Sequence, residues 1–157
     1  MLKLTKKVDY ALLALNLMAR NEEGGISNVR DIAALYSIPP EILAKVMQKL
    51  SKSGLIQSHN APKGGYSLKI PAEEISVLKV LVAVEGPVGI VSCSDGTDRT
   101  CQQRDQCDIR SPLERLQNNI LWFLEALSIR ELGQEPAVLK GVTDGSSLFG
   151  QPLHHKG

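Results

Sequence analysis

The sequence predicts a mainly α-helical protein with one two-stranded β-hairpin, and three observations lead to this prediction. Apolar residues recur at intervals of three and four in several stretches, which places them on one face of a helix. Glycine and proline stand at the ends of these stretches, where helices begin or stop. Two short strand-like stretches, residues 55–58 and 66–70, flank a turn that contains Pro62 and Gly64-Gly65.

Length and composition exclude several classes of protein. The 157 residues suffice for one domain, or for a small domain with an appendage. Aromatic residues make up only 4% of the chain, which argues against a base-stacking sheet of the kind that reads RNA. No run approaches the roughly 20 apolar residues of a membrane span, and the first residues lack a signal-peptide cleavage pattern. We therefore expect a cytoplasmic protein with no membrane partner.

The charges are divided unevenly between the two halves of the chain. Residues 1–72 carry ten lysines and arginines against five acidic residues, whereas residues 73–157 carry eight against twelve. The net charge of +1 therefore conceals a basic first half and an acidic second half. Such a division is typical of a nucleic-acid-binding module joined to a sensing or assembly module, although scatter alone could produce it.

The chain begins with two predicted helices. Thr5 can cap a first helix that Gly24-Gly25 ends, and Ser27 or Asn28 can cap a short second helix. The spacing places on their inner faces Val8, Ala11, Leu12, Leu15, Met18, Ala19, Val29, Ile32 and Ala33.

A third helix is predicted to open at Pro39-Pro40, because proline costs nothing where the backbone N–H would be unpaired anyway. Gly54 is suited to end it. Its inner face comprises Ile42, Leu43, Val46, Met47 and Leu50. Its outer face is polar and basic and comprises Glu41, Ala44, Lys45, Gln48, Lys49 and Lys52.

A short helix, a tight connection at residues 36–38 and a second helix with a basic outer face form a helix-turn-helix. The β-hairpin that follows makes it a winged helix-turn-helix. In this arrangement the second helix reads the major groove of DNA, while the hairpin tip reaches the backbone or minor groove. The alternative is a three-helix domain that binds another protein, and we favour DNA.

The candidate DNA-binding residues have different predicted roles. Lys45 and Gln48 can reach base edges, whereas Lys49 and Lys52 suit phosphates because they lie toward the helix end. Glu41 can accept from a cytosine amino group or simply favour the helix N-terminus. At the wing, Lys63 and His59 suit phosphates, and glycine allows a close approach. The full candidate set is Pro40, Glu41, Lys45, Gln48, Lys49, Lys52, His59, Asn60, Lys63 and Gly64.

The second half predicts two further helices. Ser76 can cap the first, whose nearly continuous apolar residues from 77 to 84 suggest burial on most sides, and Gly86-Pro87 ends it. A capping box of Ser111 and Glu114 predicts the start of a long helix that extends to about Leu132. Its apolar seam comprises Leu113, Leu116, Ile120, Phe123, Leu124 and Leu127. This seam predicts pairing with a second copy in a homodimer, or packing within the chain.

All three cysteines lie in one polar loop between these helices. Cys93, Cys101 and Cys107 are separated by seven and by five mostly polar residues. Such a loop suits a metal centre better than a core, and an odd cysteine count in a reducing compartment does not suggest a disulfide framework. We expect an iron–sulfur cluster, with a zinc site or a thiol switch as the alternative.

Several stretches together resemble one family of regulators. They are LTKKVDYALLAL, IPPEILAKVMQKLSKSGLI, APKGGYSL, EEISV and the three-cysteine loop before a long helix. These are similar to the Rrf-type transcriptional regulators, which include the iron–sulfur cluster regulator IscR, the nitric-oxide regulator NsrR and the SUF-operon assembly regulators. The match covers about residues 2–132 and is most similar to the SUF-operon branch.

The resemblance implies a homodimeric winged-helix transcription factor, a repressor or activator that binds a two-fold operator. Each subunit would hold a 2Fe–2S or 4Fe–4S cluster through Cys93, Cys101 and Cys107. A histidine completes the ligands in the IscR branch, but Arg110 stands at that position here. In the NsrR branch an aspartate of the first helix serves instead, and Asp9 matches it. Where IscR has a Glu-Gln pair this chain has Ala44-Lys45, so a different operator is expected.

These predictions divide the chain into five parts: a winged helix-turn-helix at 1–72, a linking helix at 73–92, a cysteine loop at 93–110, a dimerisation helix at 111–132 and a flexible tail at 133–157. The expected function is to sense cluster status, iron or redox stress and to control cluster-assembly or iron genes. The alternatives are a nitric-oxide sensor of the same build and a cluster-free regulator. We expect no enzyme, because no phosphate-binding glycine loop, catalytic triad or paired carboxylates stand out in the sequence.

Overall fold

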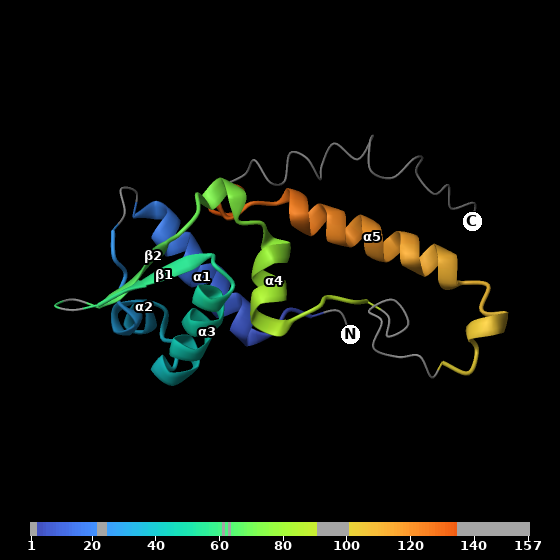
Figure 1. Cartoon of the computed structure of the whole chain (residues 1–157), viewed down its shortest axis with the longest axis horizontal. Coiled ribbons are helices and arrows are strands. Elements are labelled where there is room, and N and C mark those ends of the chain that lie inside the picture. Colours follow the sequence, from blue (N-terminus) through green and yellow to red (C-terminus); the bar gives the residue numbers. More distant parts are fainter. Residues whose placement is uncertain (1–2, 22–24, 61, 63, 91–100, 135–157) are drawn as a thin grey trace, which may run out of the picture.

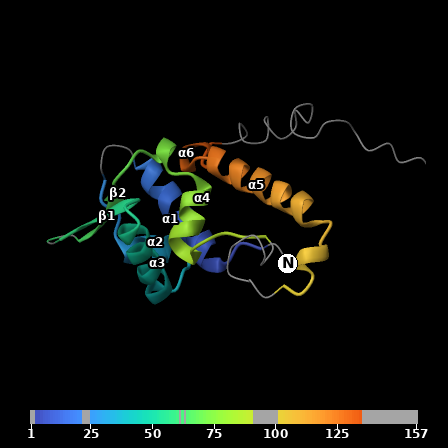
Figure 2. The ribbon, with the colours of Figure 1, turned by 45° about the vertical axis from the view of Figure 1, so that its right-hand side comes forward.

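The computed structural model describes residues 3–21, 25–60, 62, 64–90 and 101–134. The winged helix lies at one end, and the long helix α5 extends away from it (Figures 1 and 2). In chain order the elements are α1 (Lys6–Arg20), α2 (Val29–Tyr36), α3 (Pro40–Lys52), β1 (Ile56–His59), β2 (Gly65–Leu68), η1 (Ala72–Glu74), α4 (Val77–Glu85), η2 (Arg104–Gln106), α5 (Arg110–Ala126) and α6 (Ile129–Leu132).

Local signals set the start of the first three helices, as predicted. The side chains of Thr5 and Asn28 accept hydrogen bonds from backbone N–H groups in the first turns of α1 and α2. Pro40 is the first residue of α3. Ser37 adopts a left-handed conformation with φ of 53°, which turns the chain sharply between α2 and α3. The predicted helix-turn-helix is therefore confirmed.

The two strands form the wing, and a third segment fastens it to the helices. β1 and β2 pair antiparallel, with Ile56 opposite Leu68. Ser27, the other candidate cap of α2, exchanges two backbone hydrogen bonds of 2.8 and 2.9 Å with Tyr66. Gly65 permits this contact, because a Cβ there would lie 2.6 Å from the carbonyl oxygen of Ser27. The wing is thus held against the segment before α2.

The core is built around α1, which packs against α3, α4 and α6. Alanines 11 and 14 are fully buried in it, and their small side chains let the neighbouring helices approach closely. The large residues that are almost completely buried are Val8, Leu15, Ile32, Leu43, Val46, Met47, Leu50, Ile56, Ile75, Val80, Val84 and Ile129. One core therefore joins the winged helix to α4 and α6.

The predicted capping box at Ser111 is wrong. Helix α5 already begins at Arg110, one residue before the predicted cap, and its own cap makes no side-chain hydrogen bond. Glu114 instead accepts a hydrogen bond of 2.9 Å from Arg110 Nε. The capping box lies at Ser128, whose side chain and that of Glu131 reciprocally accept backbone N–H groups.

The predicted single helix to Leu132 is therefore two helices. α5 ends at Ala126, because Leu127 turns to an extended conformation and its carbonyl accepts a hydrogen bond of 2.8 Å from Val77 N–H. Ile129 N–H donates to the carbonyl of Ile75, also at 2.8 Å. The break returns α6 to the core beside α1 (Figure 2).

Other boundaries and burials also differ from the predictions. α1 ends at Arg20, ahead of the predicted Gly24-Gly25 stop. β1 begins one residue later and β2 ends two residues earlier than expected. Ile42 and Val82, predicted to face the core, are 38% and 47% exposed. Ser76 and Gly86 bound α4 as predicted.

Part of the predicted organisation lies outside the described residues. This applies to residues 91–92 of the predicted linking helix, to residues 93–100 of the cysteine loop and to residues 135–157 of the predicted tail. Within the described ranges, no helix is both long enough and apolar enough to cross a membrane.

The capping box is also sensitive to pH. The backbone N–H and hydroxyl of Ser128 donate to the carboxylate of Glu131 and lower its pKa. A lowered pKa in the folded state stabilises the fold above the pKa of an unfolded glutamate. This contribution is lost as the pH falls through the lowered value.

Replacing each serine by alanine should show which of Ser111 and Ser128 caps a helix. Ser128→Ala is expected to lower the free energy of unfolding by about 1 kcal/mol, because it removes a helix N-cap. Ser111→Ala is the matched control and should change it by less than about 0.5 kcal/mol, since Ser111 is exposed and caps nothing. Urea unfolding followed by circular dichroism measures both, and equal losses would contradict the assignment.

Candidate nucleic-acid interface and cysteine loop

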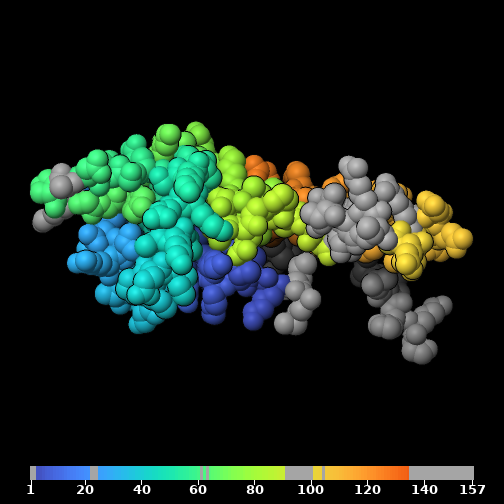
Figure 3. Space-filling view, turned by 60° about the horizontal axis from the view of Figure 1, so that its bottom comes forward, coloured from blue at the N-terminus to red at the C-terminus, as the bar shows by residue number. Residues whose placement is uncertain are grey.

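The predicted DNA-reading face of α3 is open to solvent. Pro40, Glu41, Lys45 and Gln48 are all exposed. The opposite side of the helix is anchored by four buried apolar residues, so the backbone of α3 is held rigidly under these side chains. Figure 3 shows α3 standing on one face of the molecule with α4 beside it.

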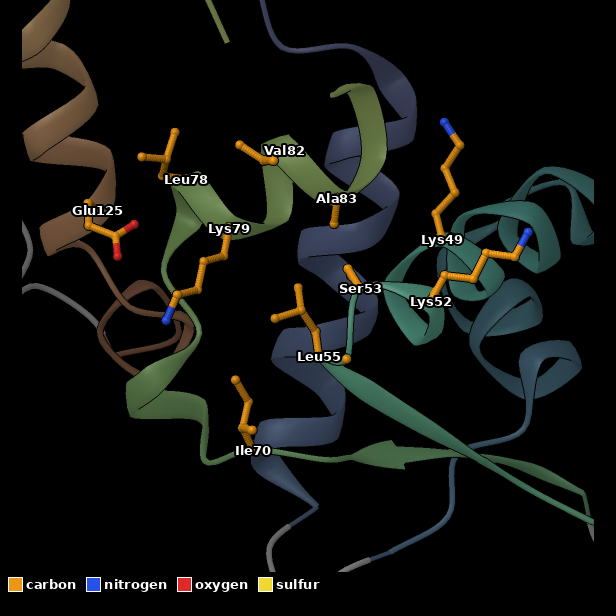
Figure 4. A pocket seen from close by; sticks show the side chains of 11 residues that line it. Lys49, Lys52, Ser53, Leu55, Ile70, Leu78, Lys79, Val82, Ala83 and Glu125 are labelled. Carbon is orange, nitrogen blue, oxygen red and sulfur yellow. The ribbon is translucent and has the colours of Figure 1, made fainter. Parts of the chain in front are cut away.

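The two lysines in the last turn of α3 have different surroundings. The ammonium of Lys49 donates a hydrogen bond to the backbone carbonyl of Val84, in the last turn of α4. Both lysines border a pocket of about 740 Å³ between α3, the turn that leads into β1, and α4. Figure 4 shows that they leave α3 in different directions, with Lys49 extending along the α4 side. Lys49 thus contacts the protein itself, and the phosphate contact predicted for it stays a prediction.

Residues of the wing are tied into the hairpin and its base. His59 Nε2 lies 2.7 Å from the hydroxyl of the buried Ser67, on the paired strand. Asn28 Nδ2 donates to the carbonyl of Gly64 at 3.2 Å, which links the cap of α2 to the wing turn. Asn60 is exposed, and Lys63 lies outside the described residues. The wing and the start of α2 therefore form one supported edge beside α3.

Two of the three cysteines can be placed. Cys101 and Cys107 are free thiols, each partly buried, and flank the short helix η2 just before α5. The thiol of Cys101 donates to Gln103 Oε1 at 3.6 Å. Within the described ranges, which omit Cys93, no group of three or more His, Cys, Asp or Glu side chains could hold a metal ion. Thiols that form no disulfide fit thiolate ligands of an iron–sulfur cluster.

The candidate fourth ligand lies in the first turn of α1. The side chain of Asp9 is 41% exposed, and its carboxylate is 3.6 Å from the ammonium of Lys6. Arg110 is paired with Glu114. The carboxylate of Asp9 is thus accessible and is weakly held by a single exposed ion pair.

One residue, which holds the segment before the cysteine loop, was missed by the sequence analysis. Gln117 is 6% exposed, and its Oε1 accepts a hydrogen bond of 3.0 Å from the backbone N–H of Ile90. This bond fastens the segment that leads into the cysteine loop to the helix that follows the loop. Its signal in the sequence is a polar residue in line with the apolar positions Leu113, Ile120 and Leu124.

Helix α5 also leaves apolar residues in solvent. Ile109, Leu116 and Phe123, spaced by seven residues, are 58%, 47% and 36% exposed. Gln117 is the only buried residue among the seventeen of α5, all of which the structure describes. An exposed apolar line of this period is typical of a helix that packs on a second helix.

Comparison with known proteins identifies relatives over most of the chain. A family model described as Rrf2, iron-dependent transcriptional regulator, matches residues 4–135. The chain is 30% identical over 131 residues to the transcriptional regulator NsrR of Bacillus subtilis, which covers 83% of this chain and 90% of that protein. It is 32% identical over 138 residues to IscR of Photorhabdus laumondii, covering 88% and 83%.

Solved structures share the fold. CymR, the global cysteine regulator of B. subtilis, superimposes with a TM-score of 0.69 at 21% identity, covering 85% of this chain and 97% of that one. IscR of T. potens gives 0.61 at 20% identity, covering 96% and 94%. These likenesses confirm the winged-helix architecture.

Removing the amide of Gln117 should loosen the start of the cysteine loop. Gln117→Leu keeps the size of the side chain but leaves the Ile90 N–H unpaired, so we expect a loss of about 1–3 kcal/mol in unfolding free energy. Hydrogen exchange at Ile90 should accelerate in parallel. Asn118→Leu, on an exposed face, is the control; unchanged exchange at Ile90 in Gln117→Leu would contradict the role.

Proposed function

The chain belongs to the Rrf2 family of transcriptional regulators, and from this premise we propose that it is a homodimer that senses iron–sulfur cluster status, iron or redox stress. In this proposal a cluster held by Cys93, Cys101 and Cys107 governs binding to a two-fold DNA operator. The regulated genes are those of cluster assembly or iron metabolism.

The proposal of DNA binding rests on α3, which has one face exposed to solvent and the opposite face packed in the core. A recognition helix must present side chains to base edges without losing its own position, and the buried side of α3 supplies that anchor. Lys45 and Gln48 lie where they can read bases, Lys52 suits a phosphate, and Glu41 lies at the helix N-terminus. His59, Asn60, Lys63 and Gly64 belong to the wing that would contact the backbone or minor groove.

The chemistry of the donors supports the cluster. Two free thiols lie six residues apart before α5, and the third cysteine precedes them in the same loop. Thiolates are the ligands of iron–sulfur clusters, and three of them leave one iron to be completed by another group. Asp9 is the proposed fourth ligand. A carboxylate there suits a sensor, because it holds iron less firmly than a thiolate does.

A second candidate uses the same cysteines without a cluster. The thiols of Cys101 and Cys107 are free and partly accessible, which favours a thiol switch or a zinc site over an inert core role. A nitric-oxide sensor would share the cluster and the DNA-binding surface. Iron and sulfide analysis distinguishes the cluster from the cluster-free alternatives.

The proposed dimer uses the exposed line of α5. Ile109, Leu116 and Phe123 would pack against the same residues of a second copy, because a two-fold interface places one patch on both subunits. Two copies of α3 would then read two half-sites.

Each cysteine should be necessary for the cluster. Cys93→Ala, Cys101→Ala and Cys107→Ala are each expected to reduce iron and sulfide in anaerobically purified protein by at least about tenfold, because removing one of the three thiolates leaves an incomplete ligand set. The helical circular dichroism spectrum should remain that of the unsubstituted protein. Undiminished iron and sulfide in all three variants would exclude the loop as the cluster site.

Placing a charge on the exposed line of α5 should produce monomers. Leu116→Asp adds a carboxylate that would be buried and unpaired in the dimer. We expect the dimer to dissociate at least a hundredfold more readily, which is a loss on the order of 3 kcal/mol in the free energy of association. Asn118→Asp adds the same charge on the opposite side of α5 and should not affect it. Sedimentation equilibrium measures both, and a Leu116→Asp protein that still dimerises would exclude this surface.

A further inference from the structure

The last turn of α4 receives a side chain from each of two other helices. Lys49, from α3, donates its ammonium hydrogen bond to the backbone carbonyl of Val84. The hydroxyl of Thr5, which also caps α1, donates to Glu85 Oε1 at 2.6 Å. These partners are 35 and 80 residues apart in the sequence, so both bonds are tertiary contacts. The end of α4 is thus a junction between the helix that would read DNA and the central helix.

The chemistry of a helix C-terminus explains the Lys49 contact. The last four carbonyls of a helix have no partner within it and carry the negative end of the helix dipole. A lysine ammonium is a favourable donor there, and hydrogen bonds to charged groups are stronger than neutral ones. The side chain of Val84 is fully buried, so the turn that accepts this bond is fixed in the core. Lys49 therefore acts as a cap for α4 that α3 supplies.

This junction lies directly before the cysteine loop. Gly86, with φ of 90°, ends α4. The chain then runs to Ile90, whose N–H donates to Gln117, and Cys93 follows three residues later in the sequence. The last turn of α4, to which α3 is fastened, is therefore the last helical turn before the cysteine loop in the sequence.

We propose that Lys49 is a positioning residue that couples the orientation of α3 to the last turn of α4, the helix that precedes the cysteine loop in the sequence. In this role Lys49 does not contact DNA phosphates, and Lys52 makes the phosphate contact instead. The proposal rests on the proposed function, because it assumes that α3 binds DNA. The linkage is reciprocal: DNA that holds α3 must also steady the end of α4.

The salt dependence of DNA binding separates positioning from phosphate contact. The full chain, free of metal and with reduced thiols, is titrated against a duplex that the unsubstituted protein selects from a random library. Lys49→Met keeps the aliphatic stem and removes the donor, so we expect affinity to fall roughly tenfold with an unchanged slope of log affinity against log salt. Lys52→Met should reduce the slope by about 0.9, the value of one lost phosphate contact. Lys49→Arg, which keeps a cationic donor, should restore most of the affinity.

Hydrogen exchange at the end of α4 tests the coupling. The Gly86 N–H, which bonds to the carbonyl of Val82, should exchange several-fold faster in Lys49→Met. Added duplex should slow this exchange in the unsubstituted protein and in Lys52→Met, but not in Lys49→Met. If Lys49 only stabilised the fold, its substitution would not abolish the slowing of Gly86 exchange by DNA.

The outcomes distinguish the coupling from the function beneath it. If the unsubstituted chain binds no duplex, the proposed function fails and the coupling fails with it. If that chain binds, a Lys49→Met slope reduced by about 0.9 overturns the coupling alone, as does DNA protection of Gly86 that survives in this variant. An unchanged slope together with lost protection supports it.

Discussion

The burial of α1 is the constraint on which the rest of the structure depends. Ala11, Ala14 and Leu15 are fully buried, and α3, α4 and α6 all pack on this one helix. The small alanine side chains allow a close approach from several sides, and close packing transmits small shifts rather than absorbing them. The proposed DNA-reading helix α3 and the helix before the cysteine loop, α4, therefore both pack on the same central helix.

The sequence predicted the elements whose signals are local. Thr5, Asn28, Ser76 and Pro40 begin helices because their side chains or ring satisfy the first turn from within a few residues. The failure at Ser111 follows from the same physics. Ser-Pro-Leu-Glu at 111–114 and Ser-Ile-Arg-Glu at 128–131 have the same local pattern, so sequence alone does not choose between them. At the Ser128 pattern, backbone hydrogen bonds to the Ile75–Val77 segment interrupt the helix, so that a new helix starts there. At the Ser111 pattern, the side chain of Glu114 is instead bonded to Arg110.

The candidate site could be predicted only where exposure and residue type suffice. The outer face of α3 followed from helical periodicity, and Glu41, Lys45 and Gln48 are exposed as expected. The partner of Lys49 could not be predicted, because it is a backbone carbonyl 35 residues away and carbonyls have no sequence signature. Gln117 was overlooked because it stands among leucines in a seam that periodicity marks as apolar. Both residues act through the tertiary structure.

The central claim is that one chain joins cysteine chemistry to DNA binding, and the described residues supply two tertiary hydrogen bonds that bear on it. The segment before the cysteine loop is held at Ile90 by Gln117, α4 ends just before this segment, and α3 is fastened to that end by Lys49. The proposed fourth ligand, Asp9, lies in the first turn of α1, whose cap Thr5 also bonds to the end of α4. Asp9, the proposed fourth ligand, and Lys49, on the proposed DNA-reading helix, thus belong to two helices that are both bonded to the last turn of α4.

The most direct test measures the DNA affinity of anaerobically purified protein for its selected duplex, before and after a chelator removes the iron from the same sample. The account predicts that the affinity changes by at least about fivefold, the lower end of typical coupling between two sites. Equal affinities in the two states, or a DNA-binding protein with no iron to remove, would contradict it.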